Sequence, residues 1–424
     1  MGKLLTEEKY GYYVKVLRDE LVPAMGCTEP IAIAYAAAKA RQTLGHFPTE
    51  AELCVSGNII KNAKSVVVPH TGGLKGLEAA LIAGLVGGDA DARLEVLSNI
   101  SQVDINTMRE VRERLPVRIS LSDSDSLFDI GVRLRCGEEE SYVRITDRHT
   151  NVVLVERNGE RLFEGQVTEH HENEIRELSV EDIVTFADTV RLEDVEDVIE
   201  RQIRCNTAIA EEGLSGNWGA NVGRVYMNAY APDVSVKAKA YAAAGSDARM
   251  NGCELPVIIN SGSGNQGLTA SLPVIVYWRE LGLQRERLIR ALCLSNLLTV
   301  HIKHGIGTLS AYCGAVCAGA GAGAGIAYLY GGGYREIAHT LVNTLAIDSG
   351  MICDGAKASC AAKIATAVEN GILGFNLYRS GNQFLGGDGI VKKGVERTIE
   401  SVSTLAKLGM TDTDKVILSI MLDT

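Results

Sequence analysis

The sequence has too little positive charge to suit a polyanionic partner. Its 53 acidic residues outnumber 42 basic ones, and the formal net charge is −11. A surface that binds nucleic acid or an anionic membrane gathers Lys and Arg, so the charge balance argues against both partners. The N-terminus, MGKLLTEEKYGYY, also lacks the apolar core of a secretory signal peptide. We therefore expect a soluble, cytoplasmic protein.

Membrane-spanning segments and disulfides are also not expected. The uncharged segment 313–333 is long enough to cross a membrane, but its centre alternates Gly and Ala, which contribute little to transfer into lipid. We predict a buried, closely packed helix there instead. Ten cysteines in a reducing compartment are not expected to pair as disulfides, so they need another explanation.

The hydrophobic pattern changes twice along the chain. Residues 1–40 read as two helices, and Pro23 and Pro30 should leave Met25–Glu29 as a loop between them. Residues 41–178 contain segments that alternate apolar and polar residues with period two, which is typical of half-covered strands. Within this block 74–114 is predicted to be helical, and Asn158-Gly159 predicts a tight hairpin turn.

From Ser179 onward the pattern is helical again. Ser179 and Asp182 resemble an N-cap with an acidic third position, and the remainder is rich in Ala, Gly and Leu. At 424 residues and 46% hydrophobic, the chain is long enough for two domains. We predict an α+β fold with an α+β domain (41–178) inserted after N-terminal helices (1–40) that pack on a mostly helical catalytic domain (179–424).

The cysteines divide into two groups by their surroundings. Four lie singly in apolar or strand-like segments and are interpreted as small core residues: Cys54, Cys136, Cys253 and Cys293. Cys205 is undecided. The other five lie in Gly-rich or turn-rich stretches: Cys27, Cys313, Cys317, Cys353 and Cys360.

The spacing of Cys353 and Cys360 permits a metal pair without requiring one. In a straight helix, seven residues would separate the two thiols by about 10.5 Å of rise, which is too far for one compact cluster. Asp354-Gly355 is a turn signal that would interrupt such a helix and bring the two sulfurs together.

Four stretches in order make the chain resemble the iron–sulfur L-cysteine desulfidases, relatives of the bacterial L-serine dehydratase alpha chain. They are GCTEP, SGSGNQG, YCG and NTLAIDSGMICDGAKASC. The resemblance implies a [4Fe–4S] cluster held by Cys313, Cys353 and Cys360, with Cys27 as the fourth ligand; the family pattern gives Cys317 no role. Soft thiolates suit iron–sulfur chemistry, although structural zinc would use the same ligand type.

Two further loops are candidate substrate-binding sites. His70, Thr71 and Gly72 precede a predicted helix whose N-terminus offers free N–H groups to an anion. This string is similar to the substrate-carboxylate loop of the serine dehydratases; an ordinary helix-start turn is the alternative.

The second loop, INSGSGNQG, contains a formal G-x-G-x-x-G pattern. A dinucleotide site would need a second parallel strand after it, and Pro273 is expected to interrupt the segment that follows. We interpret the loop as presenting Ser261, Ser263 and Asn265 to a small polar substrate, in keeping with the family's Asn/Gly loop. His301 and His304 receive no role.

The resemblance implies a lyase of cysteine catabolism that converts L-cysteine to pyruvate, ammonia and hydrogen sulfide. Iron would act as a Lewis acid on the leaving sulfur, and Cys27 would be displaced from it and serve as the base. The alternatives are L-serine dehydration at the same site and a non-catalytic iron–sulfur redox sensor. No cysteine follows Cys360, whereas the dehydratases carry their fourth cysteine near the C-terminus. A homo-oligomer is left open.

Overall fold

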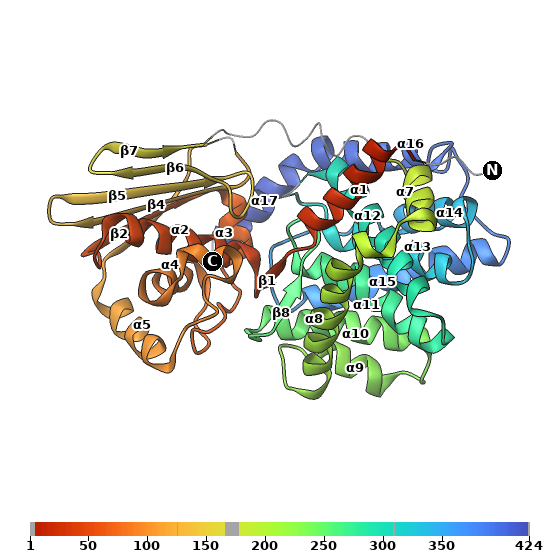
Figure 1. The fold of residues 1–424 in the computed structure, drawn as a ribbon, viewed down its shortest axis with the longest axis horizontal. Coiled ribbons are helices and arrows are strands. Elements are labelled where there is room, and N and C mark those ends of the chain that lie inside the picture. The colour runs from red at the N-terminus through yellow and green to blue at the C-terminus, as the bar shows by residue number, and fades with distance from the viewer. Residues whose placement is uncertain (1–4, 125, 166–177, 308–309, 423–424) are drawn as a thin grey trace.

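The protein, seen in a computed structural model, forms two lobes (Figure 1). The structure describes residues 5–124, 126–165, 178–307 and 310–422. One lobe is built on a six-stranded sheet, and the other is an assembly of helices. The predicted α+β class with a largely helical C-terminal part is confirmed.

The sheet has the strand order β3-β2-β4-β5-β6-β7. Only the β2–β3 pair is parallel, because a helical crossover connects these two strands. The remaining neighbours pair antiparallel. Asn158 and Gly159 form the β6–β7 turn with φ of 51° and 80°, as the hairpin prediction required. The strands are β2 (Glu50–Val55), β3 (Val117–Leu121), β4 (Asp129–Cys136), β5 (Glu139–Thr146), β6 (Val152–Arg157) and β7 (Glu160–Glu164).

Helices cover one face of this sheet. Helix α2 packs directly on β4 and β5, and α4 packs on α2 at close range because Gly84 lies against the backbone carbonyl of Ala34. The predicted helical segment 74–114 contains α4, a short 3₁₀ helix and α5. The helices of this lobe are α2 (Thr28–Leu44), α3 (Gly57–Ala63), α4 (Gly76–Gly87), η1 (Ala90–Glu95) and α5 (Gln102–Arg114).

The helical lobe surrounds one central helix, α13, which is buried from Ala315 to Leu329. This confirms the predicted buried helix, and among the described residues no helix is long and apolar enough to cross a membrane. Ser179 caps α7 by accepting a hydrogen bond from the N–H of Asp182. The helices are α1 (Glu7–Glu20), α7 (Val180–Thr189), α8 (Glu196–Ser215), α9 (Val222–Ala229), α10 (Val234–Met250), α11 (Gly264–Leu281), α12 (Arg285–Ile306), α13 (Gly314–Leu329), α14 (Tyr334–Asp348), α15 (Cys360–Arg379), α16 (Val395–Thr404) and α17 (Thr411–Leu422).

The chain crosses between the lobes earlier than the expected boundary at residue 40. Helix α1 contributes to the core of the helical lobe, as expected, but α2 belongs to the core under the sheet. Between them β1 (Pro23–Met25) pairs antiparallel with β8 (Pro256–Ile258) of the helical lobe. The first crossing therefore falls at Gly26 and Cys27, and α17 later returns to contact α3 of the sheet lobe.

Two proline predictions need correction. Met25–Glu29 is not all loop, because α2 begins at Thr28 and includes Pro30 in its first turn. A missing N–H has no cost there, since first-turn N–H groups have no partner within the helix. Pro273 lies inside the long helix α11; buried packing on both sides outweighs the lost hydrogen bond.

Close packing of α13 on α15 gives a stability prediction. A Cβ at Gly323 would lie 2.4 Å from the backbone oxygen of Gly371, so Gly323→Ala should lower the free energy of unfolding by about 1–3 kcal/mol. Gly11→Ala in α1 is the matched control, because a Cβ there meets nothing within 4 Å; it should raise stability by about 0.5–1 kcal/mol. Denaturant titration measures both, and equal effects would contradict this packing.

Candidate active site

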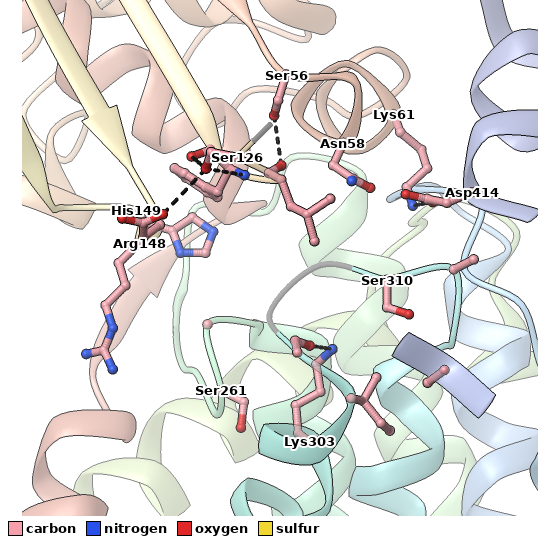
Figure 2. A pocket seen from close by; sticks show the side chains of 18 of the residues that line it. Ser56, Asn58, Lys61, Ser126, Arg148, His149, Ser261, Lys303, Ser310 and Asp414 are labelled. Atoms are coloured by element: carbon pink, nitrogen blue, oxygen red, sulfur yellow. Dashed lines mark hydrogen bonds and ion pairs between the residues drawn. The ribbon is translucent and has the colours of Figure 1, made fainter. Parts of the chain in front are cut away.

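A cavity of about 1120 Å³ lies between the two lobes. The sheet lobe contributes α3, the loop around Ser126 and the turn that carries His149, while the helical lobe contributes Ser261, Lys303 and α17 (Figure 2). Lys61 of α3 and Asp414 of α17 form an ion pair at its edge. The cavity is therefore formed only when both lobes are present.

Three of the predicted cysteine ligands occupy helix N-termini. Cys27 is the N-cap of α2, Cys313 is the N-cap of α13, and Cys360 is the first residue of α15. Neither N-cap cysteine makes a side-chain capping hydrogen bond. The free N–H groups and the positive end of the helix dipole at such positions favour anionic ligands and thiolates.

Cys313 and Cys353 are brought together by a short antiparallel bridge. Tyr312 pairs with Ile352, the N–H of Cys313 donates to Met351 O at 3.1 Å, and the N–H of Cys353 donates to Ala311 O at 2.6 Å. The two cysteines are therefore diagonal neighbours on one face of the bridge. Sulfurs of two diagonal neighbours can each bind a different metal atom of one cluster.

The segment between Cys353 and Cys360 is a turn, as the Asp354-Gly355 pair predicted. Gly355 has a φ of +91°, and a Cβ there would lie 2.2 Å from Lys61 O. The helix begins only at Cys360, whose thiol lies 3.6 Å from Gly355 O. This turn places Cys360 near enough to Cys313 and Cys353 to act on the Cys313 thiol electrostatically.

Cys27 reaches the same region from the first crossing between the lobes. It forms a small buried cluster with Val66 and Met250, against which Cys360 packs. Gly26 has a φ of +59°, and a Cβ there would lie 2.3 Å from Pro69, so only glycine lets the GCTEP turn lie this close to the 66–72 loop. Cys27 and Cys360 thus lie against one buried cluster, and Cys360 in turn acts on the Cys313 thiol.

Buried cations accompany these thiols. Burial lowers the pKa of Lys303, which faces Cys317, Cys353 and Cys313. Burial also lowers the pKa of Arg249, which faces Cys27, Glu29 and Cys360. In the absence of a bound group, burial raises the pKa of the Cys313 thiol to about 12, with a further contribution from Cys353. Burial thus disfavours the charged forms of Lys303 and Arg249, and the neighbouring sulfurs favour them.

These features fit a [4Fe–4S] cluster. Within the described residues no three His, Cys, Asp or Glu side chains gather as a single metal ion would need, since one zinc ion requires every sulfur at about 2.3 Å from it. A four-iron cluster takes one thiolate on each iron, so its cysteines stand further apart. The all-thiol donor set, the helix N-termini and the buried cations suit such an anionic group.

The predicted substrate residues are divided between two places. Ser261 lines the cavity, and Ser263 is the N-cap of α11. Asn265 accepts a hydrogen bond from Arg249 at 3.1 Å. The His70–Gly72 string lies on the other side of the GCTEP turn: His70 Nδ1 is 3.4 Å from Glu254, and the buried Thr71 hydroxyl bonds to Val68 O and Leu74 N. Gly72 has a φ of +67°.

Sequence reasoning missed a polar group that surrounds Cys27. The thiol of Cys27 donates to Glu29 Oε2 at 3.1 Å, and Asn62 Nδ2 donates to Glu29 Oε1 at 3.1 Å. His149, carried on a turn of the sheet lobe, lies 4.0 Å from Glu29. Burial lowers the pKa of His149. Glu29 is part of GCTEP and could have been found there, whereas His149 and Arg249 carry no local sequence signal.

Three other sequence features have structural explanations. Cys317 is fully buried in α13, one turn after Cys313. His301 bonds to Glu396 at 2.7 Å, away from the cysteines. The glycine loop follows β8, whose one strand neighbour in the described structure is the antiparallel β1, so it is not part of a dinucleotide-binding βαβ unit.

Comparison with known proteins gives the class. The sequence model described as "Serine dehydratase alpha chain" matches residues 91–419, a range that includes Cys313, Cys353 and Cys360 but begins after Cys27. The chain belongs to this family, whose chemistry is of the lyase or dehydratase type.

Full-length relatives cover the remainder of the chain. A UPF0597 protein of Desulfitobacterium hafniense is 55% identical over 98% of this chain and 97% of its own. UPF0597 proteins of Lachnoclostridium phytofermentans and Treponema denticola are 51% and 46% identical, over 98% and 99% of this chain and 100% and 99% of their own. The similarity thus extends through the GCTEP turn and the sheet lobe.

Proposed function

We propose that the protein is an L-cysteine desulfidase, which eliminates hydrogen sulfide from L-cysteine to give pyruvate and ammonia. The observations that carry this proposal are the packing of Cys360 against the buried cluster of Cys27 and the short bridge that makes Cys313 and Cys353 neighbours. Family membership supports elimination chemistry on a small amino acid.

Each cysteine has a proposed role. Cys313, Cys353 and Cys360, with Cys27 as the fourth ligand, would hold a [4Fe–4S] cluster. When bound, it supplies an iron that acts as a Lewis acid toward the sulfur of the substrate. Cys27 differs from the other three because it lies on the crossing between the lobes, where a shift of the turn can free its thiol.

The protein's own residues would handle the protons. As a thiolate, Cys27 takes the α-proton, and the C–H electron pair becomes the Cα–Cβ double bond. The C–S bond breaks, the sulfur leaves as hydrosulfide with the electrons of that bond, and the new Cys27 thiol returns the proton to give hydrogen sulfide. The resulting enamine tautomerises to an imine, and water hydrolyses it to pyruvate and ammonia. Glu29 accepts a hydrogen bond from the Cys27 thiol at 3.1 Å, so it orients this thiol.

L-Serine dehydration is the second candidate, favoured by the description of the family that matches the chain. The same residues would serve, with hydroxide as the leaving group. The position of Cys27 in the GCTEP turn, ahead of the three later cysteines, resembles the desulfidases and favours L-cysteine in our proposal. A redox sensor would need neither the cavity nor the Ser261 loop that lines it.

The test is a paired assay on protein purified without oxygen. We expect a broad visible absorbance from the bound cluster and release of equal amounts of sulfide and pyruvate from L-cysteine. L-Serine is assayed beside it for pyruvate. Turnover of L-serine alone would favour the dehydratase over the desulfidase. A protein that shows the cluster absorbance but acts on neither amino acid would favour the redox sensor.

A further inference from the structure

Arg249, at the C-terminal end of α10, is a buried cation whose hydrogen-bond donors are not all used by the part of the chain that the structure describes. Its side chain is 2% exposed, yet its guanidinium is poorly satisfied. One hydrogen bond joins Nη1 to Asn265 Oδ1 at 3.1 Å, and within the described residues Nε has no partner. A buried guanidinium is stable only where an anion or several acceptors compensate its charge.

The position of Arg249 relative to α11 is fixed by a glycine. A Cβ at Gly264 would lie 2.3 Å from Arg249 Nε, so the unpaired nitrogen points at the first turn of this 18-residue helix. The N-cap, Ser263, makes no side-chain capping hydrogen bond. Free N–H groups of a helix N-terminus and a buried guanidinium are two independent sources of attraction for the same anion.

The surroundings define which anion fits. The loop before α11 lines the cavity through Ser261 and Gly262, so a small molecule can approach from there. On its other sides Arg249 faces Cys27, Glu29 and Cys360, and both Glu29 oxygens already accept hydrogen bonds, from the Cys27 thiol and from Asn62. An anion held here is therefore one end of a molecule whose other end lies among the cysteines, and a planar carboxylate matches the fork of a guanidinium.

We propose that Arg249, together with the N-terminus of α11, binds the α-carboxylate of the amino-acid substrate and makes the site selective for ligands that carry one. This inference rests on the proposed function for the identity of the substrate. It assigns to Arg249 a specificity role that the His70–Gly72 string would otherwise hold, since the Thr71 hydroxyl is already bonded to Val68 O and Leu74 N.

The experiment compares two fragments of L-cysteine by isothermal titration of the anaerobically prepared protein. 3-Mercaptopropionate keeps the carboxylate and the thiol, whereas cysteamine keeps the amine and the thiol. Arg249→Met should weaken the binding of 3-mercaptopropionate about 10- to 100-fold and leave the affinity for cysteamine unchanged. Arg249→Lys keeps the charge but loses the planar guanidinium that donates two parallel hydrogen bonds. Its affinity for 3-mercaptopropionate should therefore lie between those of the wild type and Arg249→Met. The ratio of the two affinities within one variant is independent of the fraction of folded protein.

Several results would overturn the inference. If the affinities for 3-mercaptopropionate and cysteamine fall equally and iron is lost, Arg249 only stabilises the arrangement of the cysteines and does not bind the carboxylate. If Arg249→Met binds 3-mercaptopropionate as the wild type does and His70→Ala does not bind it, the carboxylate is bound by the His70 loop instead. Because binding is measured without turnover, a protein that discriminates the fragments but eliminates neither L-cysteine nor L-serine would contradict the proposed function and uphold the carboxylate site.

Discussion

Cys313→Ala should abolish the visible absorbance of anaerobically purified protein and remove its bound iron, while Cys317→Ala should keep both. Cys313 is the N-cap of α13 and Cys317 lies one turn further on, so the two substitutions make the same chemical change near the same helix end. Cys313 stands at the free helix N-terminus beside Cys353, whereas Cys317 is enclosed in the core. Loss of a thiolate ligand removes a bond that a methyl group cannot replace.

Cys353→Ala and Cys360→Ala are expected to behave as Cys313→Ala does. Iron and acid-labile sulfide are measured for each purified variant, with circular dichroism to show that the helices remain. Iron retained in all three variants would mean that the cluster assignment is wrong. Iron lost equally from Cys317→Ala would show that the measurement reports disturbance of α13 rather than ligation.

Cys27→Ser should retain most of the iron but lose turnover by a factor of about 10²–10⁴. Three thiolates from the helical lobe remain in this variant, and the serine hydroxyl is close to the thiol in size. Burial and the neighbouring Glu29 raise the pKa of the Cys27 thiol, but a serine hydroxyl is far harder still to deprotonate than a thiol, so the α-proton would have no base. Iron, sulfide and pyruvate are measured for the variant under nitrogen.

Two outcomes would revise the role of Cys27. If iron is lost together with activity, Cys27 is an architectural ligand and nothing about a base follows. If activity stays near that of the wild type, the base lies elsewhere, and His149 and His70 are the next residues to replace. Glu29→Gln is a useful companion variant, because it removes the charge beside the Cys27 thiol while keeping nearly the same side-chain shape.

Local signals explain why much of the fold could be predicted from the sequence. Period-two alternation and Asn158-Gly159 placed the hairpin, Ser179 marked a helix start, and Asp354-Gly355 marked the turn before Cys360. Each depends on backbone preferences of a few adjacent residues. The predictions at Pro30 and Pro273 were wrong for different reasons. In the first turn of α2, Pro30 loses no intrahelical hydrogen bond, and in α11 the packing of a buried helix outweighs the helix-breaking preference of Pro273.

Only those residues of the candidate site that lie in recognisable sequence motifs could be predicted. Cys27, Ser261 and the three later cysteines lie in recognisable strings, but their convergence at three helix N-termini is a tertiary property. Arg249 and His149 come from different lobes and have no neighbouring pattern. Their importance becomes visible only through burial and missing hydrogen-bond partners, which no short-range rule reports.

The return of α17 to the sheet lobe has a consequence for biosynthesis. Leu418 fills the space at Gly57, and Lys64 Nζ donates to the backbone oxygen of Met421. The surface of α3 is therefore covered by a helix that lies more than 340 residues later in the chain (411 − 63 = 348). Cys360 likewise emerges 333 residues after Cys27 (360 − 27). The sheet lobe therefore completes its surface only after the helical lobe has been synthesised, and the four candidate ligands are present together only once Cys360 has emerged.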